Sequence, residues 1–556
     1  MNNREVGAIL DKIADLLSIK GENHHKIRAY RKAADTIYHL EEDINCLHQA
    51  GRIQELPGIG RTLKGNIEEI IEKGSCEYCE ELLREIPQGV LDMLSLPGIG
   101  PKTVKIIYDH LGIDNLSDLY AAAEQKKIRK LPGLGGKTEY NIKKGIEMLN
   151  QSAGKITLGL ALPVAQELRD FILQSKAVID ACIVGSIRRG KPLISDIDIL
   201  VACVDRGQVF SKLQNYKNLQ TITDYSNEII TGRVSYGIPF EIIMVSPEDY
   251  YLSMVRTTGS KQHLKAISNG IASEALAELN SEQEFYRKID CQYIWPELRE
   301  NRGEIDLAKK YQLPELITGD DIKGDLHVHS DWSDGANKIQ ELAMAAKARN
   351  YSYLAITDHS KSLPISGGLN EDRLNAQMKV IDALNDELED ITILKGIEVD
   401  VLKNGQLDFS DQVLEKLDIV VASIHSHFHL DKEKQTERVL SAIKTGQVDI
   451  FGHLTGRLLN RRSGYELDVE KILTAAAQHN VVLEINSHPD RLDIDEHIAR
   501  VASLHGVKVA INSDAHHKSD LNLLHYGVLS ARRGWLTRED VINAWDIETL
   551  LDYLRE

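Results

Sequence analysis

The sequence has few cysteines and no long apolar run. Six cysteines in 556 residues are too few for a disulfide framework, and Cys76-x-x-Cys79 has no second pair at zinc-ribbon spacing. No apolar run reaches the roughly 18–20 residues that span a bilayer, and the N-terminus lacks a signal-peptide core. These absences argue against a disulfide-rich secreted scaffold and an integral membrane protein. They predict reduced thiols, a cytoplasmic location and no membrane partner.

Basic residues are outnumbered by acidic residues over the whole chain. The net charge is −18, which argues against a polyanionic partner when the chain is taken as a whole. Most of the acidic excess lies beyond residue 321, however, and the first 320 residues are close to balance. The total charge therefore does not exclude DNA, because local basic patches in the first 320 residues can still bind phosphates.

One short element occurs three times in the first 150 residues. Residues 56–60, 96–100 and 131–135 each read Leu-Pro-Gly-(Ile or Leu)-Gly, and a helix-forming stretch with Lys or Arg follows each. The proline ends one helix, the glycines turn the chain, and the next helix offers free N–H groups and its positive dipole end to a phosphate. One such hairpin is equally well an ordinary helix connection, but three in tandem predict sequence-independent binding to the DNA backbone. The candidate contacts are Gly58, Gly60, Gly98, Gly100, Lys102, Gly133 and Gly135.

An acidic pair follows a glycine-rich turn in the middle of the chain. The stretch Gly185-Ser-Ile-Arg-Arg-Gly190 lets the backbone approach a triphosphate, while Arg188 and Arg189 neutralise phosphate charge. Asp196 and Asp198 alternate with isoleucines in a predicted strand, so both carboxylates share one face and can hold two Mg²⁺ ions. A solvated strand edge with a chance Asp-x-Asp is the alternative, and it leaves the upstream turn unexplained. The combination predicts two-metal nucleotidyl transfer.

With residues 29–34 (Ala-Tyr-Arg-Lys-Ala-Ala), the glycine hairpins and Thr258-Gly-Ser260, residues 1–315 resemble the family X DNA polymerases of the nucleotidyltransferase superfamily. The resemblance implies a helical domain that grips the 5′ side of a gap, followed by thumb, palm and fingers. It implies dNTP as substrate and Mg²⁺ or Mn²⁺ at the palm. The implied nucleotide-binding residues are Gly185, Ser186, Arg189, Gly259 and Ser260. The implied catalytic carboxylates are Asp196, Asp198 and, on a later strand, Glu241.

Several residues depart from the family pattern at this site. Glu241 stands where the family has an aspartate, and a displacement of ~1 Å costs on the order of 100-fold in rate. Arg256-Thr257 replace two aromatics that pack the sugar in the family. Leu264 and Ser268 replace polar groups at the nascent base pair. We therefore expect a polymerase that is weak, tolerant of sugar type, or silent.

The family's 5′-deoxyribose-phosphate lyase depends on a Schiff-base lysine in the helix after the first hairpin. The matching residue here is Asn66. Lys64 lies two residues earlier, about 200° around a helix, and is expected to face away. The sequence therefore gives little support for lyase activity.

The last 235 or so residues carry nine imidazoles and carboxylates at the ends of short apolar runs. These runs, near 323–329, 353–358, 392–400, 418–424, 449–452, 481–486 and 507–513, alternate with helical patterns. The alternation predicts a parallel barrel with its function at the C-terminal strand ends. Ligation by nitrogen and oxygen without cysteine favours Mn²⁺, Zn²⁺ or Fe²⁺. The candidate metal ligands are His327, His329, Asp334, His359, Glu398, His425, His453, Asp514 and His516.

The series of these residues along the chain resembles that of the PHP (polymerase and histidinol phosphatase) domain, and the resemblance covers residues 321 to about 540. The resemblance implies a distorted (β/α)7 barrel and three divalent metals, with Mn²⁺ favoured and Glu398 bridging. Asp358 is either a residue behind the ligands or a surface residue. His427 and His429 are interpreted as rim or substrate-contacting groups rather than ligands. Arg457, Arg461 and Arg462 form either a phosphate clamp or a solvated basic loop.

The two halves together are similar to bacterial PolX repair enzymes. The expected domains are 1–84 (helical, DNA-binding), 85–152 (helix-hairpin-helix thumb), 153–245 (palm), 246–311 (fingers), 312–322 (linker) and 323–556 (PHP). The resemblance implies gap filling, metal-dependent 3′→5′ exonuclease or phosphodiesterase activity and, in some members, abasic-site cleavage in base excision repair. Gapped or nicked DNA is the expected partner of a monomer. The alternatives are a gap-binding scaffold with a silent polymerase core, and a small phosphate-ester phosphatase.

Overall fold

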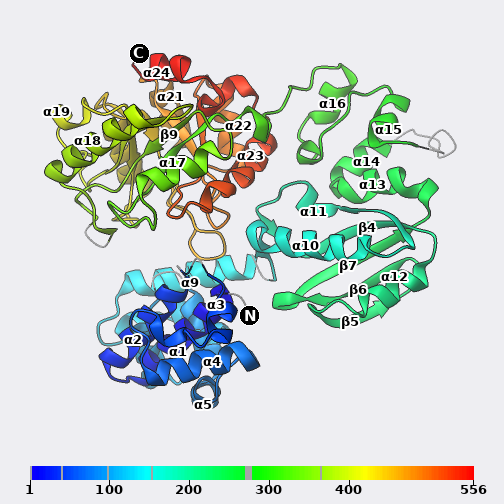
Figure 1. Cartoon of the computed structure of the whole chain (residues 1–556), viewed down its shortest axis with the longest axis horizontal. Helices are drawn as coiled ribbons and strands as arrows, with labels where there is room; N and C mark the ends of the chain where they lie inside the picture. Colours follow the sequence, from blue (N-terminus) through cyan, green and yellow to red (C-terminus); the bar gives the residue numbers. More distant parts are fainter. Residues whose placement is uncertain are drawn as a thin grey trace. The chain divides into compact units, whose positions relative to one another are not determined.

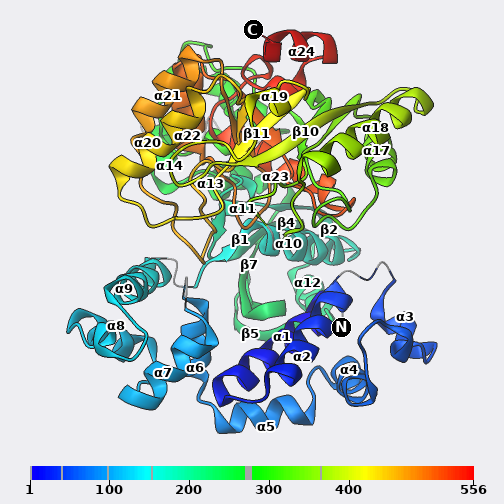
Figure 2. The ribbon, with the colours of Figure 1, turned by 90° about the vertical axis from the view of Figure 1, so that its left-hand side faces the viewer.

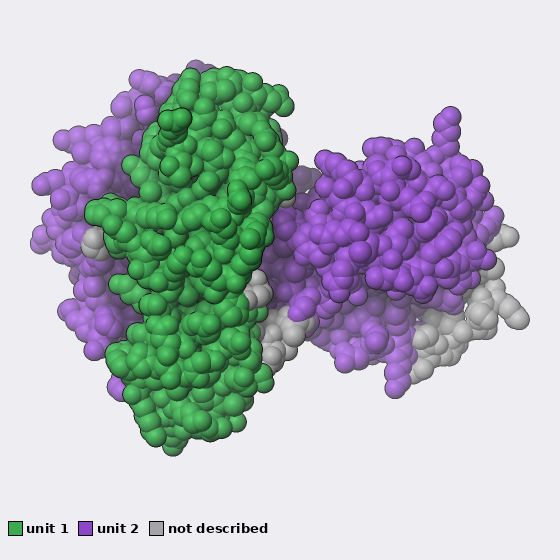
Figure 3. Space-filling view, turned by 90° about the horizontal axis from the view of Figure 1, so that it is seen from below, with its two compact units in different colours: residues 1–153, 461–463 green, residues 154–460, 464–556 purple. Residues whose placement is uncertain are grey.

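The computed structural model describes residues 3–38, 40, 42–96, 99–151, 154–268, 279–363 and 366–555. The chain divides into two compact units, shown in different colours in Figure 3. Unit 1 comprises Met1–Ala153 with Arg461–Ser463, and unit 2 comprises Gly154–Asn460 with Gly464–Glu556. Within the described ranges, no helix is long and apolar enough to cross a membrane.

The described residues of unit 1 fold into helices around one core. The apolar residues at helical spacing in the first helix, such as Val6, Leu10 and Ile13, are fully buried. A helix begins directly after Gly60, Gly100 and Gly135, so the predicted helix-hairpin-helix architecture is confirmed. The helices are α1 (Asn3–Lys20), α2 (His24–Tyr38), α3 (Ile44–Gln49), α4 (Arg61–Lys73), α5 (Glu77–Glu85), α6 (Gln88–Asp92), α7 (Pro101–Leu111), α8 (Leu116–Glu124) and α9 (Gly136–Gln151) (Figure 1).

Unit 2 begins with a five-stranded sheet in the order β2-β4-β7-β6-β5, which we call the palm sheet. Its strands are β2 (Val178–Ile183), β4 (Ile197–Cys203), β5 (Leu219–Tyr225), β6 (Ile229–Val234) and β7 (Ile238–Val245). Strands β4 and β7 are parallel, and the other pairs are antiparallel. A short pair, β1 (Ile156–Thr157) with β3 (Leu193–Ile194), and helices α10 (Leu158–Leu173), α11 (Gly185–Arg188) and α12 (Arg206–Leu213) complete this part.

A small helical cluster follows the palm sheet. It comprises α13 (Tyr250–Thr258), α14 (Lys261–Ser268), α15 (Glu282–Lys288) and α16 (Glu304–Lys309). Val255, Phe285 and Tyr286 lie in its core. The sequence pattern predicts a helical segment over residues 261–278; α14 covers it to Ser268, and residues 269–278 lie outside the described residues.

The rest of unit 2 is a seven-stranded parallel sheet in the order β14-β13-β12-β11-β10-β9-β8. A parallel bridge between Val328 and Ala515 brings the two edge strands together, so the predicted barrel is confirmed as a nearly closed one. Its strands are β8 (Gly324–Val328), β9 (Tyr353–Ile356), β10 (Thr392–Asp400), β11 (Ile419–Ser423), β12 (Ile450–Phe451), β13 (Val482–Asn486) and β14 (Val509–Asn512). Its helices are α17 (Ile339–Lys347), α18 (Glu371–Glu387), α19 (Asp411–Leu414), α20 (Lys432–Ile443), α21 (Val469–Gln478), α22 (Glu496–Leu504), α23 (Leu524–Arg533) and α24 (Ile547–Arg555), which flank the strands (Figure 2).

Candidate functional site

The palm sheet brings the predicted catalytic carboxylates to neighbouring strands. Asp198 on β4 lies opposite Glu241 on β7, and Asp196 directly precedes β4 at an exposed position. Burial, together with the nearby charges of Asp196 and Glu241, raises the pKa of Asp198 to about 7. A carboxyl group that resists ionisation beside two other carboxylates is favourable for a cation, which would offset their repulsion. A hollow of about 230 Å³ lies beside it, lined by Asp196, Thr223, Thr231, Gly232, Arg233, Pro239, Phe240 and Glu241.

The predicted triphosphate turn is shaped by this carboxylate. Gly185 has a positive φ of 64°, and a Cβ there would overlap the Asp198 carboxylate. Only glycine combines that backbone conformation with so close an approach. The Ser186 hydroxyl is buried and has no hydrogen-bond partner among the described residues. It is therefore a polar group available to a ligand.

Both arginines of the turn already have protein partners. Arg188 donates to Glu282 and to the Thr258 hydroxyl (Nη1···Oγ1 2.8 Å). Arg189 donates to Glu300 (Nε···Oε1 2.9 Å) and to the Thr258 carbonyl (2.7 Å). These contacts fix the turn against the end of α13. The phosphate contact expected of Arg189 stays a prediction.

Gly259 and Ser260 form the turn between α13 and α14. A Cβ on Gly259 would lie 2.9 Å from His263 and 3.0 Å from Leu264, so a side chain there would push α14 away. The Ser260 amide donates to the Arg299 carbonyl, and its hydroxyl accepts from the His263 amide. The turn is therefore tightly built, and the nucleotide contacts of both residues stay predictions.

The barrel brings the nine predicted metal ligands into one cluster, in which five imidazoles surround the carboxylate of Glu398. Its Oε1 lies 3.1 Å from His453 Nε2, 3.3 Å from His425 Nε2 and 3.4 Å from His327 Nε2. Its Oε2 lies 2.6 Å from His359 Nδ1 and 3.7 Å from His329 Nε2. One carboxylate surrounded by five imidazoles is well placed to be shared between cations. The expected bridging role of Glu398 is consistent with this position and stays a prediction.

Two further carboxylates complete the cluster. Asp514 Oδ1 lies 3.1 Å from His329 Nε2, and Asp334 Oδ1 lies 3.4 Å from His516 Nε2. Among the described residues, three groups have ligand atoms close enough to hold one metal ion, and all three are in the barrel. They are His329-Asp334-His359-His516, His327-His329-Asp514 and His359-Glu398-His425. Asp196, Asp198 and Glu241 do not form such a group.

The protonation states and unpaired atoms of the cluster fit metal ions. Burial, with His516 and His359 nearby, lowers the pKa of His329 to about 3, so its ring is neutral and able to ligate. Burial opposes the charged form of His359, but the Glu398 and Asp334 carboxylates raise its pKa to about 10. Both ring nitrogens of His329 and Nε2 of His327 are buried without a hydrogen bond to any described residue. Divalent cations would satisfy these atoms and replace the stabilising protons.

A second layer of carboxylates orients the candidate ligands, and sequence reasoning missed it. Glu484 is fully buried in β13, with Oε1 2.7 Å from His327 Nδ1 and Oε2 accepting from the His453 amide at 2.7 Å. Asp400 Oδ1 lies 3.7 Å from His425 Nδ1. An isolated glutamate inside the apolar run Val482-Leu-Glu-Ile was the available signal, because a buried carboxylate needs partners.

The structure also places the residues that were expected near the barrel site but not as metal ligands. Asp358 is fully buried and accepts from Ser330, Ser333 and Gln377, so the surface alternative was wrong. Arg457 donates to the Arg491 carbonyl (2.9 Å), so its guanidinium already binds the protein and is not free to act as a phosphate clamp. The role of Arg461 and Arg462 stays a prediction.

The hairpins of unit 1 have the backbone geometry expected for phosphate contact. Gly58 and Gly133 adopt positive φ, and Gly60 and Gly100 precede helices whose first turns lack a side-chain cap. Lys102 is exposed, and Gly98 lies outside the described residues. Free N–H groups at a helix start are suited to an anion.

At the lyase position, the Asn66 amide donates to the Tyr30 hydroxyl at 2.7 Å, and Lys64 contacts Gln54 at 3.0 Å. Neither residue therefore offers an unpaired amine in the position of the family's Schiff-base lysine.

Tandem helical hairpins, a palm sheet with paired carboxylates and a histidine-rich parallel barrel define a multidomain protein of the DNA-processing, phosphate-chemistry class. Family models agree with these parts. "Helix-hairpin-helix domain" matches residues 1–76, "SAM-like Helix-hairpin-helix tandem" matches 90–147, and "PHP domain" matches 325–488.

Whole-chain comparison gives the family. The chain is 35% identical over 573 aligned residues to the "DNA polymerase/3′-5′ exonuclease PolX" of Bacillus subtilis (strain 168), with all of both chains covered. This chain belongs to the PolX family. Its C-terminal part is also 32% identical over 243 residues to a "Probable phosphatase" of Thermoanaerobacter sp. (strain X514), covering 42% of this chain and 94% of the relative. A "Probable phosphatase" of Vibrio atlanticus (strain LGP32) is 31% identical over 207 residues, covering 35% and 79%.

Proposed function

We propose that this protein is a DNA repair enzyme that binds gapped or nicked DNA as a monomer and hydrolyses phosphodiesters at the 3′ end. Abasic-site cleavage would be a related use of the same site. The observation that carries the proposal is the clustering of nine imidazoles and carboxylates in the barrel, five of the imidazoles beside Glu398, in a chain related to PolX over its whole length. The tandem hairpins supply the DNA contacts that a small-molecule phosphatase would not need.

In the barrel, the nine clustered side chains would hold up to three divalent metals, with Mn²⁺ favoured over Zn²⁺ or Fe²⁺. When bound, such ions supply the positive charge that activates water and stabilises charge developing at phosphorus. The protein's own contribution is orientation. Glu484 fixes the ring of His327, and Asp400 lies beside the ring of His425.

In the palm, we propose nucleotidyl transfer from dNTPs with Mg²⁺ or Mn²⁺ held by Asp196, Asp198 and Glu241. The support is the opposition of Asp198 and Glu241 in register and the available Ser186 hydroxyl. Because these carboxylates do not form a compact metal-binding group, synthesis is proposed to be weaker than hydrolysis.

The first test measures hydrolysis. Labelled 3′ ends are incubated with the purified protein and Mn²⁺, and His327→Ala is compared with wild type. We expect the wild-type protein to release mononucleotides. The rate of release should fall on the order of 100-fold or more in the variant, because it lacks His327, a candidate metal ligand beside Glu398. Undiminished release by His327→Ala would contradict the assignment of the metal centre.

The second test measures synthesis on gapped DNA with dNTPs. Glu241→Asp shortens the side chain opposite Asp198, and we expect synthesis to rise on the order of 10–100-fold if carboxylate placement limits the rate. An unchanged rate would indicate that Arg256 and Thr257, and not the placement of the carboxylate, limit synthesis. Gap affinity without extension in either protein and either metal would favour the scaffold alternative for the palm.

A second candidate function is hydrolysis of a small phosphate monoester by the barrel. The similarity of this part to probable phosphatases favours it. Phosphate release from small monoesters at a higher kcat/KM than from DNA 3′ ends would support this candidate over the exonuclease.

A further inference from the structure

A hollow of about 700 Å³ lies beside the metal-ligand cluster, and none of the activities proposed so far uses it. It is lined by Ser362, Asp400, Leu402, Lys403, Asn404, Ser426 and His427, and we call it the 403 pocket. Asp400 joins the pocket to the metal centre, because it contacts the candidate ligand His425. Pockets that hold small ligands have volumes of about 300–1,000 Å³, so a nucleotide fits by size.

One wall of the pocket is a closed turn. The Leu402 amide donates to the Gln406 carbonyl (2.8 Å), and the Gly405 amide donates to the Leu402 carbonyl (2.9 Å). Gly405 has a φ of 85° and packs so closely on α20 that a Cβ would lie 3.1 Å from the Arg438 carbonyl. Lys403 and Asn404 are therefore held, exposed, at the tip of a fixed turn.

A buried guanidinium connects this turn to Ser426, another lining residue. Arg438 is 2% exposed and donates to the carbonyls of Val401, Leu402 (2.9 Å) and Ser426 (2.8 Å). Its charge therefore lies behind the lining residues Leu402 and Ser426. A phosphate is the group that such a charge, with Lys403 at the rim, attracts.

The remaining lining groups suit a sugar and a base. Ser362 and Ser426 offer hydroxyls, Asn404 offers an amide, and Leu402 offers an apolar surface. His427 is exposed and has a φ of 54°, a left-handed conformation that is uncommon for a residue with a side chain and is one of the forms of backbone strain that cluster at functional sites. Aromatic rings are the usual stacking partners of unpaired bases.

We infer that the 403 pocket receives one nucleotide of the strand whose 3′ end is cleaved, with Lys403 on a backbone phosphate and His427 on the base. The inference rests on the proposed exonuclease function and names the substrate contact of that same site. The small phosphatase function would have no use for Lys403.

The test uses the full-length protein loaded with Mn²⁺ and two substrates. A labelled single-stranded oligonucleotide carries further backbone phosphates and bases for the pocket, whereas bis(p-nitrophenyl) phosphate is a phosphodiester with no second phosphate for Lys403 to bind. In Lys403→Ala we expect KM for DNA to rise roughly tenfold with kcat near wild type, because one phosphate contact is lost. Cleavage of bis(p-nitrophenyl) phosphate should stay at the wild-type rate.

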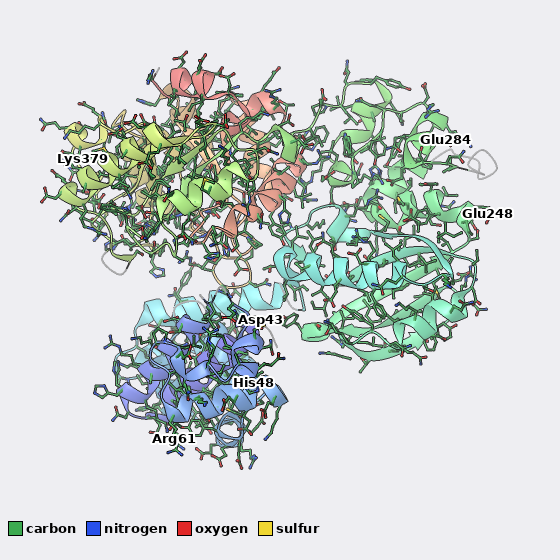
Figure 4. The ribbon with its side chains drawn as sticks, viewed as in Figure 1. Asp43, His48, Arg61, Glu248, Glu284 and Lys379 are labelled. Atoms are coloured by element: carbon green, nitrogen blue, oxygen red, sulfur yellow. The ribbon has the colours of Figure 1, made fainter. Side chains whose placement is uncertain are left out.

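Salt dependence separates a phosphate contact from a structural effect. Losing one contact to single-stranded DNA should lower the slope of log affinity against log salt by roughly 0.7, and Lys403→Arg should restore it. Lys379→Ala is the matched control, because Lys379 is an exposed lysine on α18 of the same barrel (Figure 4).

Three outcomes would overturn the inference. If Lys403→Ala keeps the wild-type KM and the wild-type salt slope, Lys403 does not contact a phosphate. If Lys379→Ala changes both by the same amount, the effect comes from the loss of any surface positive charge and not from the pocket. Failure of the wild-type protein to cleave DNA while it cleaves bis(p-nitrophenyl) phosphate would refute the proposed exonuclease, and the pocket's assignment would fall with it.

Discussion

Replacing Glu484 by Gln removes a charge behind the metal centre while almost preserving the side chain's shape. Glu484 Oε1 lies 2.7 Å from His327 Nδ1 and accepts from Asn512 Nδ2 at 3.0 Å, and Oε2 accepts from the His453 amide at 2.7 Å. One buried carboxylate therefore orients two candidate ligands. An amide has one oxygen, so Gln cannot accept from both His327 and the His453 backbone.

The size of the effect follows from these contacts. Removing a partner behind a metal ligand typically costs 10–100-fold in metal affinity or activity. That corresponds to about 1.4–2.8 kcal/mol at 1.4 kcal/mol per tenfold. We expect Glu484→Gln to fall in this range for Mn²⁺ affinity, and the exonuclease rate at limiting Mn²⁺ to fall with it.

The assay is a Mn²⁺ titration of metal-free protein by calorimetry, followed by exonuclease rates over the same metal range. Asn543→Ala is the control for stability. Asn543 is a fully buried residue of the same barrel that donates to the carbonyls of Gly324 and Ile511 and makes no hydrogen bond to a candidate ligand or to Glu484 among the described residues. It should lower Tm without changing Mn²⁺ affinity. Wild-type Mn²⁺ affinity in a folded Glu484→Gln protein would refute the orienting role.

Three other perturbations have defined outcomes. Gly185→Ala would place a Cβ on the Asp198 carboxylate, so gap filling should fall at least on the order of tenfold while 3′ hydrolysis stays at wild type; equal loss of both would contradict this. Burial raises the pKa of Asp449 to about 7 from its usual 3.8, so its ionisation in the unfolded state lowers native stability as pH rises from about 4 to 7. Asp449→Asn should therefore gain about 2–3 kcal/mol more in urea unfolding at pH 8 than at pH 5, and a pH-independent difference would contradict the shift. Arg533→Ala leaves Glu300 and Glu496 short of a buried partner and should destabilise unit 2 by about 3–5 kcal/mol in the same assay; a change below about 1 kcal/mol would show that the contact is replaceable.

The barrel was predictable from the sequence because each of its strands can be recognised from a short stretch of neighbouring residues. Strands such as β11 (Ile419–Ser423) are buried on both faces and read as continuous apolar runs, and the candidate ligands stand at their ends. Strands β5 and β6 were not predicted. The first is an edge strand whose Gln220, Thr221 and Thr223 are polar, so it lacks an apolar run. Glu484 was missed for another reason, because its partners His327 and Asn512 lie 157 and 28 residues away.

The link between palm and barrel lies in α23, which neither half of the sequence indicates alone. Gly527 of this helix approaches the barrel so closely that a Cβ would overlap the Ser487 hydroxyl. Six residues later, Arg533 donates to the Arg189 carbonyl (2.8 Å) and to Glu300, the residue that also holds the Arg189 side chain. The predicted triphosphate turn is thus held in part by a helix of the barrel.

This dependence also acts in the other direction. Arg532 of α23 is paired with Glu297 (2.7 Å) from the segment that follows the palm, and the pair is buried. Removing the segment that follows the palm would leave Arg532 without its carboxylate partner and Arg533 with Glu496 alone, which is costly because both guanidinium groups are buried. The segment that follows the palm therefore stabilises the barrel that carries the candidate metal ligands, whatever the activity of the palm. Loss of polymerase activity alone would not remove the need for that part of the chain.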